Sequence, residues 1–250
     1  MIRRILLSLL LPLVLAAPAV ADPEADFQAG LRAAAARDYA AALPRLEAAV
    51  AADPENLRYV SEYRMTVIAA KAYDHALDFF KKLVADHPQS AAAALNYGYE
   101  YVDKIPAAGS VTQVILANDA LTWFNRAIEL KPTWLALYTR GNSYLYWPRV
   151  FGRASLGVAD LEAAVRMSQQ APKRPYHVRA WISLGDGYWK TDDLEKARAT
   201  WSAGLKLFPD DPELKARLAR EGDELKEYIE GKLDPNVRVD TNLKELWSNP

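Results

Sequence analysis

The chain has 250 residues, of which 31 are Lys or Arg and 32 are Asp or Glu, so its formal net charge is −1. This balance argues against a nucleic-acid-binding protein that relies on bulk positive charge. The absence of cysteine excludes disulfides, thiolate nucleophiles and thiolate metal sites. With 51% hydrophobic and 25% charged residues, the composition is that of a folded protein and not of a disordered one.

The N-terminus has the three parts of a secretory signal peptide, over residues 1–21. Two arginines precede an apolar stretch, and the small-x-small sequence Ala19-Val20-Ala21 follows it. We therefore expect cleavage after Ala21, a periplasmic or secreted location, and no stable membrane span in the mature chain. The alternative is an uncleaved anchor, because residues 5–21 carry no charge and are just long enough to cross a bilayer.

A pattern with a 34-residue spacing runs through the rest of the chain. Two small residues seven positions apart, with a bulky one between them, line one face of a helix, and a later proline stops that helix. The repeat is clearest in the first two copies, where each residue of the second copy lies 34 positions after its counterpart in the first. The copies are Ala42, Leu46, Ala49 and Pro54; Ala76, Phe80, Leu83 and Pro88; Ala120, Phe124, Ala127 and Pro132; Ala197, Trp201, Gly204 and Pro209; and a degenerate one at Gly157, Leu161, Ala164 and Gln169.

A further helix is expected ahead of each of these, and four of the five carry glycine at the same position: Gly30, Gly98, Gly141 and Gly185. Glycine inside a helix costs about 1 kcal/mol relative to alanine. Close approach of a neighbouring helix, which a Cβ would block, is the compensating reason. Arg64 takes this position in the second copy, where we expect looser packing.

The fifth copy resembles a complete tetratricopeptide repeat, with Trp181, Leu184, Gly185 and Tyr188 ahead of Ala197, Trp201, Gly204 and Pro209. The resemblance covers about residues 23–211. It implies an all-α, right-handed superhelical solenoid of about five helix pairs, whose concave face commonly holds a peptide or protein segment. The expected repeats are 23–56, 57–90, 91–133, 134–171 and 178–211, followed by one capping helix at 212–231 and a tail at 232–250.

Two insertions fall between the first and second helices of a pair, at residues 102–118 in the third copy and around residues 146–153 in the fourth. In a solenoid these turns share one edge, so we expect the insertions to be neighbours and to mark a binding face. Trp147, Arg149, Phe151 and Arg153 suit an aromatic and anionic partner segment. The alternative is that Trp147 and Phe151 fill a gap left by a displaced helix.

Helical phase places a further set of side chains on the concave face, which is mostly apolar with isolated polar residues. An exposed apolar surface of that extent requires cover. We predict that a segment of another exported or envelope protein lies there; the alternative is that the chain's own tail fills the groove. The predicted partner-binding residues are Arg58, Met65, Tyr99, Tyr138, Asn142, Trp147, Arg149, Arg153, Arg179, Asp186 and Trp189.

Enzymatic chemistry is not indicated by any motif. His75, His87 and His177 share no metal-ligand spacing and are expected on the surface. Phosphate-binding loops and nucleophile elbows are absent from the sequence. We expect no enzyme, cofactor or metal, and predict a periplasmic protein-binding adaptor or assembly factor. The alternative is a non-enzymatic binder of a hydrophobic small molecule or lipid in the cell envelope.

Overall fold

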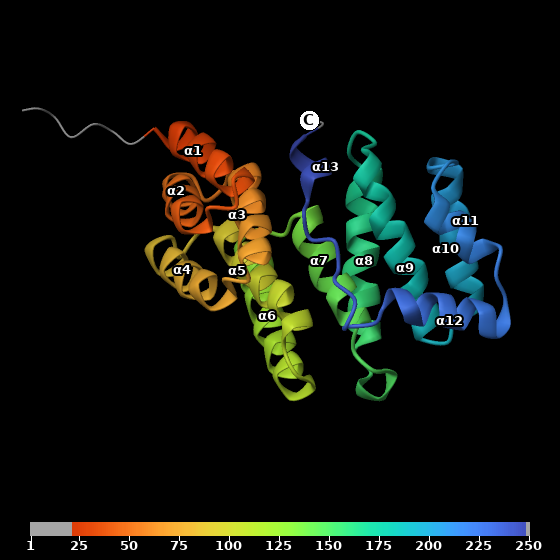
Figure 1. Cartoon of the computed structure of the whole chain (residues 1–250). Coiled ribbons are helices and arrows are strands. Elements are labelled where there is room, and N and C mark those ends of the chain that lie inside the picture. The colour runs from red at the N-terminus through yellow and green to blue at the C-terminus, as the bar shows by residue number, and fades with distance from the viewer. Residues whose placement is uncertain (1–21, 249–250) are drawn as a thin grey trace, which may run out of the picture.

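The computed structural model describes residues 22–248, and these form an all-α solenoid, which confirms the predicted fold class (Figure 1). The expected signal peptide and its cleavage site lie outside the described residues. Successive helices form five pairs. They are α1 (Pro23–Ala35) with α2 (Tyr39–Ala52), α3 (Leu57–Ala70) with α4 (Tyr73–Asp86), α5 (Ala91–Lys104) with α6 (Ser110–Leu130), α7 (Trp134–Leu145) with α8 (Ala154–Gln169), and α9 (Val178–Lys190) with α10 (Leu194–Leu207).

Glycine allows the two helices of a pair to approach closely. A Cβ on Gly141 would lie 2.8 Å from Leu161 Cγ, and a Cβ on Gly30 would lie 2.7 Å from Leu46 Cγ. A Cβ on Gly185 would overlap the indole of Trp201. These distances are shorter than real Cβ contacts, so the repeated glycine is required by the packing of α1 on α2, α7 on α8, and α9 on α10.

The two helices of the second pair, α3 and α4, approach each other far less closely than the helices of the other four pairs, which confirms the expectation of looser packing at Arg64. Arg64 is fully buried, and its Nε and Nη2 donate to Oδ2 of Asp103 at 2.9 and 2.7 Å. Its guanidinium carbon lies 4.4 Å from the ring centre of Tyr99. The buried Arg64 side chain therefore contacts α5.

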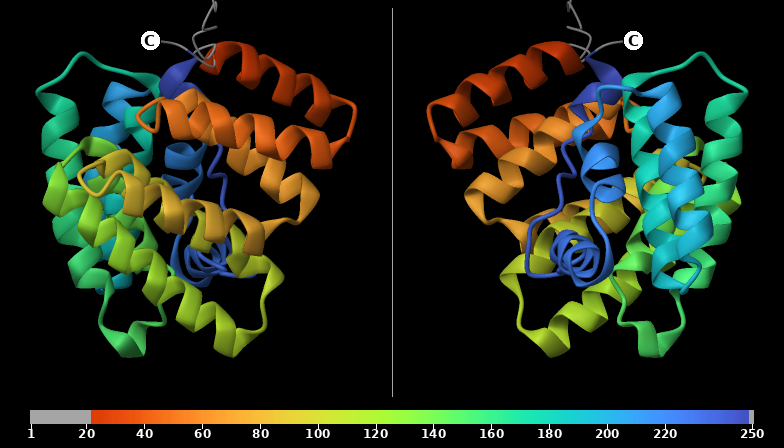
Figure 2. Two further views of the ribbon diagram at one scale, coloured as in Figure 1. Left: turned by 90° about the vertical axis from the view of Figure 1, so that its left-hand side faces the viewer. Right: turned by 90° about the vertical axis from the view of Figure 1, so that its right-hand side faces the viewer.

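The first insertion is mostly helical. After α5 ends, a short 3-10 turn, η1 (Ile105–Ala107), leads directly into α6, which is 21 residues long. The second insertion forms the 3-10 turn η2 (Arg149–Phe151). Nη1 of Arg153 donates to Oδ1 of Asn118 in α6 at 3.0 Å, which confirms that the two insertions are neighbours. Both views in Figure 2 show the start of α6 and η2 projecting from the same end of the molecule.

The capping element is two helices, α11 (Pro212–Leu218) and α12 (Gly222–Lys232), so the prediction of one helix over 212–231 is wrong. The chain turns between them, and Gly222 adopts a φ of +48°, which favours glycine. α11 packs on α10, whereas α12 crosses the concave side of the solenoid (Figure 2). Leu225 and Ile229 of α12 are buried in the same core cluster as Leu145 of α7.

Candidate functional site

The C-terminal tail occupies the concave groove. Beyond α12 the chain runs without helix through residues 234–243 to the short helix α13 (Lys244–Trp247), which contacts α3 (Figure 1). Leu243 is only 2% exposed, in a core cluster with residues of α5, α6 and α7. The prediction of an open groove that receives a partner is therefore wrong. The alternative, in which the chain covers its own inner face, is the observed arrangement.

Asp103 is the centre of the contacts that hold this tail. Its Oδ1 accepts a hydrogen bond from the Thr241 hydroxyl at 2.5 Å, while its Oδ2 accepts from Arg64. Nη2 of Arg64 also donates to the Thr241 carbonyl at 3.2 Å. The Ser61 hydroxyl donates to the carbonyl of Asn242. The tail therefore adds hydrogen bonds to a buried ion pair between α3 and α5.

Glu100 is a second buried carboxyl beside this ion pair. It is fully buried, and neither side-chain oxygen has a hydrogen-bond partner among the described residues. Burial raises the pKa of Glu100 well above its ordinary value, and the negative charge of Asp103 raises it further. Because Arg64 already binds Asp103, its attraction only partly offsets this rise in pKa, and burial favours the neutral, protonated form of Glu100.

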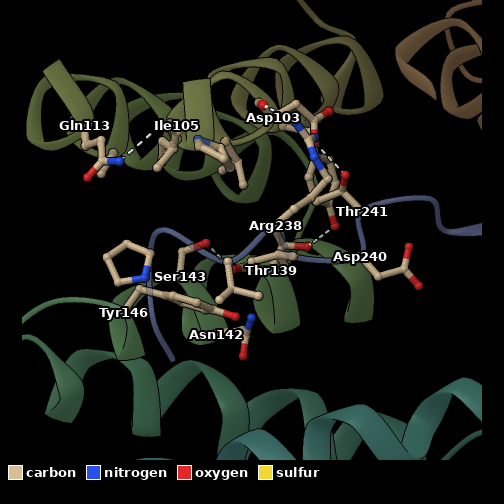
Figure 3. A pocket seen from close by; sticks show the side chains of 18 of the residues that line it. Asp103, Ile105, Gln113, Thr139, Asn142, Ser143, Tyr146, Arg238, Asp240 and Thr241 are labelled. Atoms are coloured by element: carbon tan, nitrogen blue, oxygen red, sulfur yellow. Dashed lines mark hydrogen bonds and ion pairs between the residues drawn. The ribbon is translucent and has the colours of Figure 1, made fainter. Parts of the chain in front are cut away.

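A cavity of about 310 Å³ remains between the solenoid and the tail. Figure 3 shows its two walls, with α5, η1 and α6 on one side and α7 on the other, and the tail between them. The apolar lining comes from both walls and from the tail. It includes Val102, Ile105, Val114, Ala117, Tyr138, Tyr146, Trp147, Val237 and Leu243.

The polar groups of the cavity are suited to hydrogen bonding and not to covalent chemistry. The hydroxyls of Tyr99 and Thr139 are bonded to each other at 2.5 Å. Burial raises the pKa of the Tyr138 and Tyr146 phenols, so both keep their protons at neutral pH. Nη2 of Arg238 donates to the Tyr73 hydroxyl at 2.9 Å. The lining therefore offers donors and acceptors around an apolar space, with no activated nucleophile among its described residues.

The predicted partner-binding residues fall into separate groups, and five of them line this cavity. Trp147 is one of these; it is 7% exposed and packs in a core cluster with residues of α6, whereas Phe151 remains 58% exposed. The guanidinium carbon of Arg153 lies 3.6 Å from the ring centre of Trp147. The five lining residues are Tyr99, Tyr138, Asn142, Trp147 and Arg179.

The remaining predicted residues lie elsewhere in the solenoid. Asp186, expected in the groove, is buried by the cap, and its two oxygens accept from Arg217 of α11 at 2.6 and 2.7 Å. Arg149 pairs with Asp192 at 2.7 Å and packs over the ring of Trp189. The last two belong to α3: Arg58 pairs with Glu24 at 3.4 Å, and Met65 is partly buried.

Exposed apolar side chains lie on the two insertions and at the start of α8, and we call this surface the insertion edge. Val111 at the start of α6 is 79% exposed, and Val150 of η2 is 86% exposed. Val114 lines the cavity as well, so the edge adjoins the cavity mouth. The insertion edge consists of Val111, Val114 and Ile115 of α6, Val150 and Phe151 of η2, and Leu156 of α8.

Two further findings concern metals and membranes. His177 is only 5% exposed, so its expected surface position is wrong; burial lowers its pKa and favours the neutral ring. Within residues 22–248, no cluster of three or more His, Asp or Glu side chains is arranged to hold a metal ion. No helix in the same range is both long and apolar enough to cross a bilayer.

Residues 178–221, which include the fifth helix pair, match the family model described as Tetratricopeptide repeat. Residues 178–221 thus carry a tetratricopeptide repeat, and residues 22–248 have the solenoid fold seen in tetratricopeptide-repeat proteins. Its fold is similar to that of TTC0263, a thermophilic TPR protein from Thermus thermophilus, with 21% identity, a TM-score of 0.55, and coverage of 79% of this chain and 97% of that one.

Two other solved structures share the solenoid fold. A tetratricopeptide repeat protein from Parabacteroides merdae is 15% identical, with a TM-score of 0.55 and coverage of 90% of this chain and 79% of that one. YrrB, described as a TPR protein with an unusual peptide-binding site, is 16% identical, with a TM-score of 0.51 and coverage of 80% and 93%. No curated protein matches the chain.

Sequence reasoning missed the contacts that hold the tail on the solenoid. Asp103, Thr241 and Arg238 join the tail to the inner face, and none of them was a predicted site residue. One signal was available, because Arg64 interrupts the glycine position and a buried arginine requires a carboxylate partner. Nothing in the sequence indicates which carboxylate is the partner of Arg64.

Proposed function

We propose that this chain is an exported, non-catalytic adaptor of the bacterial cell envelope that binds an apolar segment of another exported protein on its insertion edge. One observation carries the proposal. The concave groove is covered by the tail, whereas apolar side chains on the two neighbouring insertions remain exposed. Grouped exposed apolar residues on a folded protein are typical of interaction surfaces.

The fold supports the coarser part of this proposal, because tetratricopeptide-repeat solenoids are protein-interaction scaffolds. YrrB, which shares the fold, is described as having an unusual peptide-binding site. For the present chain, the binding surface is the insertion edge and not the inner face. The partner segment is expected to be apolar along the face that it lays on Ile115 and Phe151.

The periplasmic location rests on the N-terminal sequence. A signal peptide with a cleavage site after Ala21 predicts a mature protein that begins at Asp22. N-terminal sequencing of the protein from a periplasmic fraction of its own host tests this directly. A chain that keeps residues 1–21 and sediments with membranes would instead show an uncleaved anchor.

Photocrosslinking in the native host tests the binding surface. A photoreactive amino acid at position 115 or 151 is expected to form one discrete adduct with an exported polypeptide. The matched control is position 207, because Leu207 is also an exposed apolar residue but lies at the end of α10. Ile115→Asp or Phe151→Asp should abolish capture, while Leu207→Asp should not. Equal adducts at all three positions, or unchanged capture by both edge variants, would refute the proposed surface.

A further inference from the structure

The cavity beneath the tail is partly open to solvent, so it is a pocket that a ligand could enter and not an enclosed packing defect. An engineered apolar cavity of about 150 Å³ is already enough to bind benzene, and this cavity has about 310 Å³. Its size lies at the lower end of the range of about 300–1,000 Å³ found for small-molecule sites.

The walls of the cavity are built from three parts of the chain that are joined by hydrogen bonds. Tyr99 of α5 is hydrogen-bonded to Thr139 of α7, which ties the two solenoid walls to each other. The tail is fixed by the bond from Thr241 to Asp103. The cavity is therefore preformed, and a ligand would not have to order its walls.

The charges around the cavity compensate one another. Arg64 binds Asp103, and Arg179 binds Glu245 at 2.6 Å with Asp240 at 3.5 Å. Arg238 is the third cation, and Nη1 of Arg238 lies 4.0 Å from Asp103. Three arginines thus face three carboxylates. A charged ligand would lose its hydration without gaining an unpaired counter-ion.

We propose that this cavity binds a small, uncharged, predominantly apolar molecule. The ligand would contact Val102, Ala117 and Tyr146 and hydrogen-bond to groups such as the Asn142 side chain, which Figure 3 shows on the α7 wall. Val114 and Val237 line the cavity and are themselves exposed, so the ligand enters between α6 and the tail. This site adjoins the insertion edge at Val114, but it does not depend on the proposed protein-binding role.

Fluorescence titration of the mature chain tests the site with two matched probes. N-phenyl-1-naphthylamine is uncharged, and 8-anilino-1-naphthalenesulfonate carries the same kind of ring system with an added negative charge. We expect saturable single-site binding of the uncharged probe, at least about tenfold tighter than that of the anionic one. No saturable binding of the uncharged probe, or tighter binding of the anionic probe, would overturn the proposal.

Two substitutions locate the bound probe. Ala117→Trp places a large ring in the cavity and should weaken binding of the uncharged probe at least about tenfold. Thr122→Trp, on an exposed position of the same helix, is the control and should bind as the unaltered chain does. Ser143→Phe fills the cavity from α7 and serves if Ala117→Trp does not fold. Unchanged affinity in a folded cavity-filling variant would overturn the proposal without affecting the crosslinking result at the insertion edge.

Discussion

Removing the carboxylate of Asp103 is the sharpest test of how the tail is held. Asp103→Ala leaves Arg64, whose side chain is 0% exposed, without its carboxylate, and it also removes the acceptor for Thr241. Breaking a buried ion pair from one side costs about 3–5 kcal/mol. Glu100 lies close enough to Arg64 for their charges to interact, and it can ionise to replace part of the lost attraction. We therefore expect a loss of about 3 kcal/mol, at the lower end of that range.

Urea unfolding followed by circular dichroism measures this loss. For a chain of this size, about 3 kcal/mol corresponds to a fall in Tm of about 6–12 °C. Hydrogen exchange in residues 234–247 should become faster in the same variant, because the tail loses its central anchor. Asp74→Ala is the control, since it breaks an exposed pair with Lys104, and it should leave the unfolding midpoint unchanged. A loss below about 1 kcal/mol for Asp103→Ala would refute the assigned role of the ion pair.

Two further predictions concern buried positions in the helices. In the folded chain Glu100 keeps a proton that it releases above about pH 4.5 in the unfolded chain. The free energy of unfolding therefore falls as the pH rises from about 4.5 toward the pKa of Glu100 in the folded chain. Glu100→Gln should remove that loss of stability. If the urea midpoints of the variant and the unaltered chain changed in parallel between about pH 5 and about pH 8, the raised pKa of Glu100 would be contradicted. Gly185→Ala should destabilise the chain by about 1–3 kcal/mol, because the new Cβ meets the buried indole of Trp201. Gly231→Ala, where nothing lies within 4 Å of the new Cβ, should stabilise it by about 0.5 kcal/mol. Thermal melts that place these two glycine variants in the opposite order would contradict the packing argument.

The helix pairs were predictable because their signals are local. The spacing of Ala42 and Ala76, and the glycine at positions such as Gly141, report contacts between helices that are neighbours in the chain. The break in the cap was harder to predict, because residues 212–231 carry an apolar stripe that continues through the turn at Gly222. Glycine marked the turn, but glycine also occurs inside several helices of this chain.

The candidate site was only partly predictable. Helical phase placed Tyr99, Tyr138 and Asn142 on the inner face, and all three line the cavity. The same reasoning placed Asp186 there, but its partner Arg217 lies 31 residues further on and buries it. Phase along one helix shows which direction a side chain faces. It does not show which distant segment comes to cover that side chain.

The sequence by itself determined that this chain is a repeat of paired helices with two insertions on one edge, since each repeat packs mainly on its neighbours. Tertiary structure alone decided that the inner face is closed. The hydrogen bond between Thr241 and Asp103 joins residues 138 positions apart. Such a contact leaves no periodic trace in the sequence, because it forms once and depends on the curvature of the whole stack.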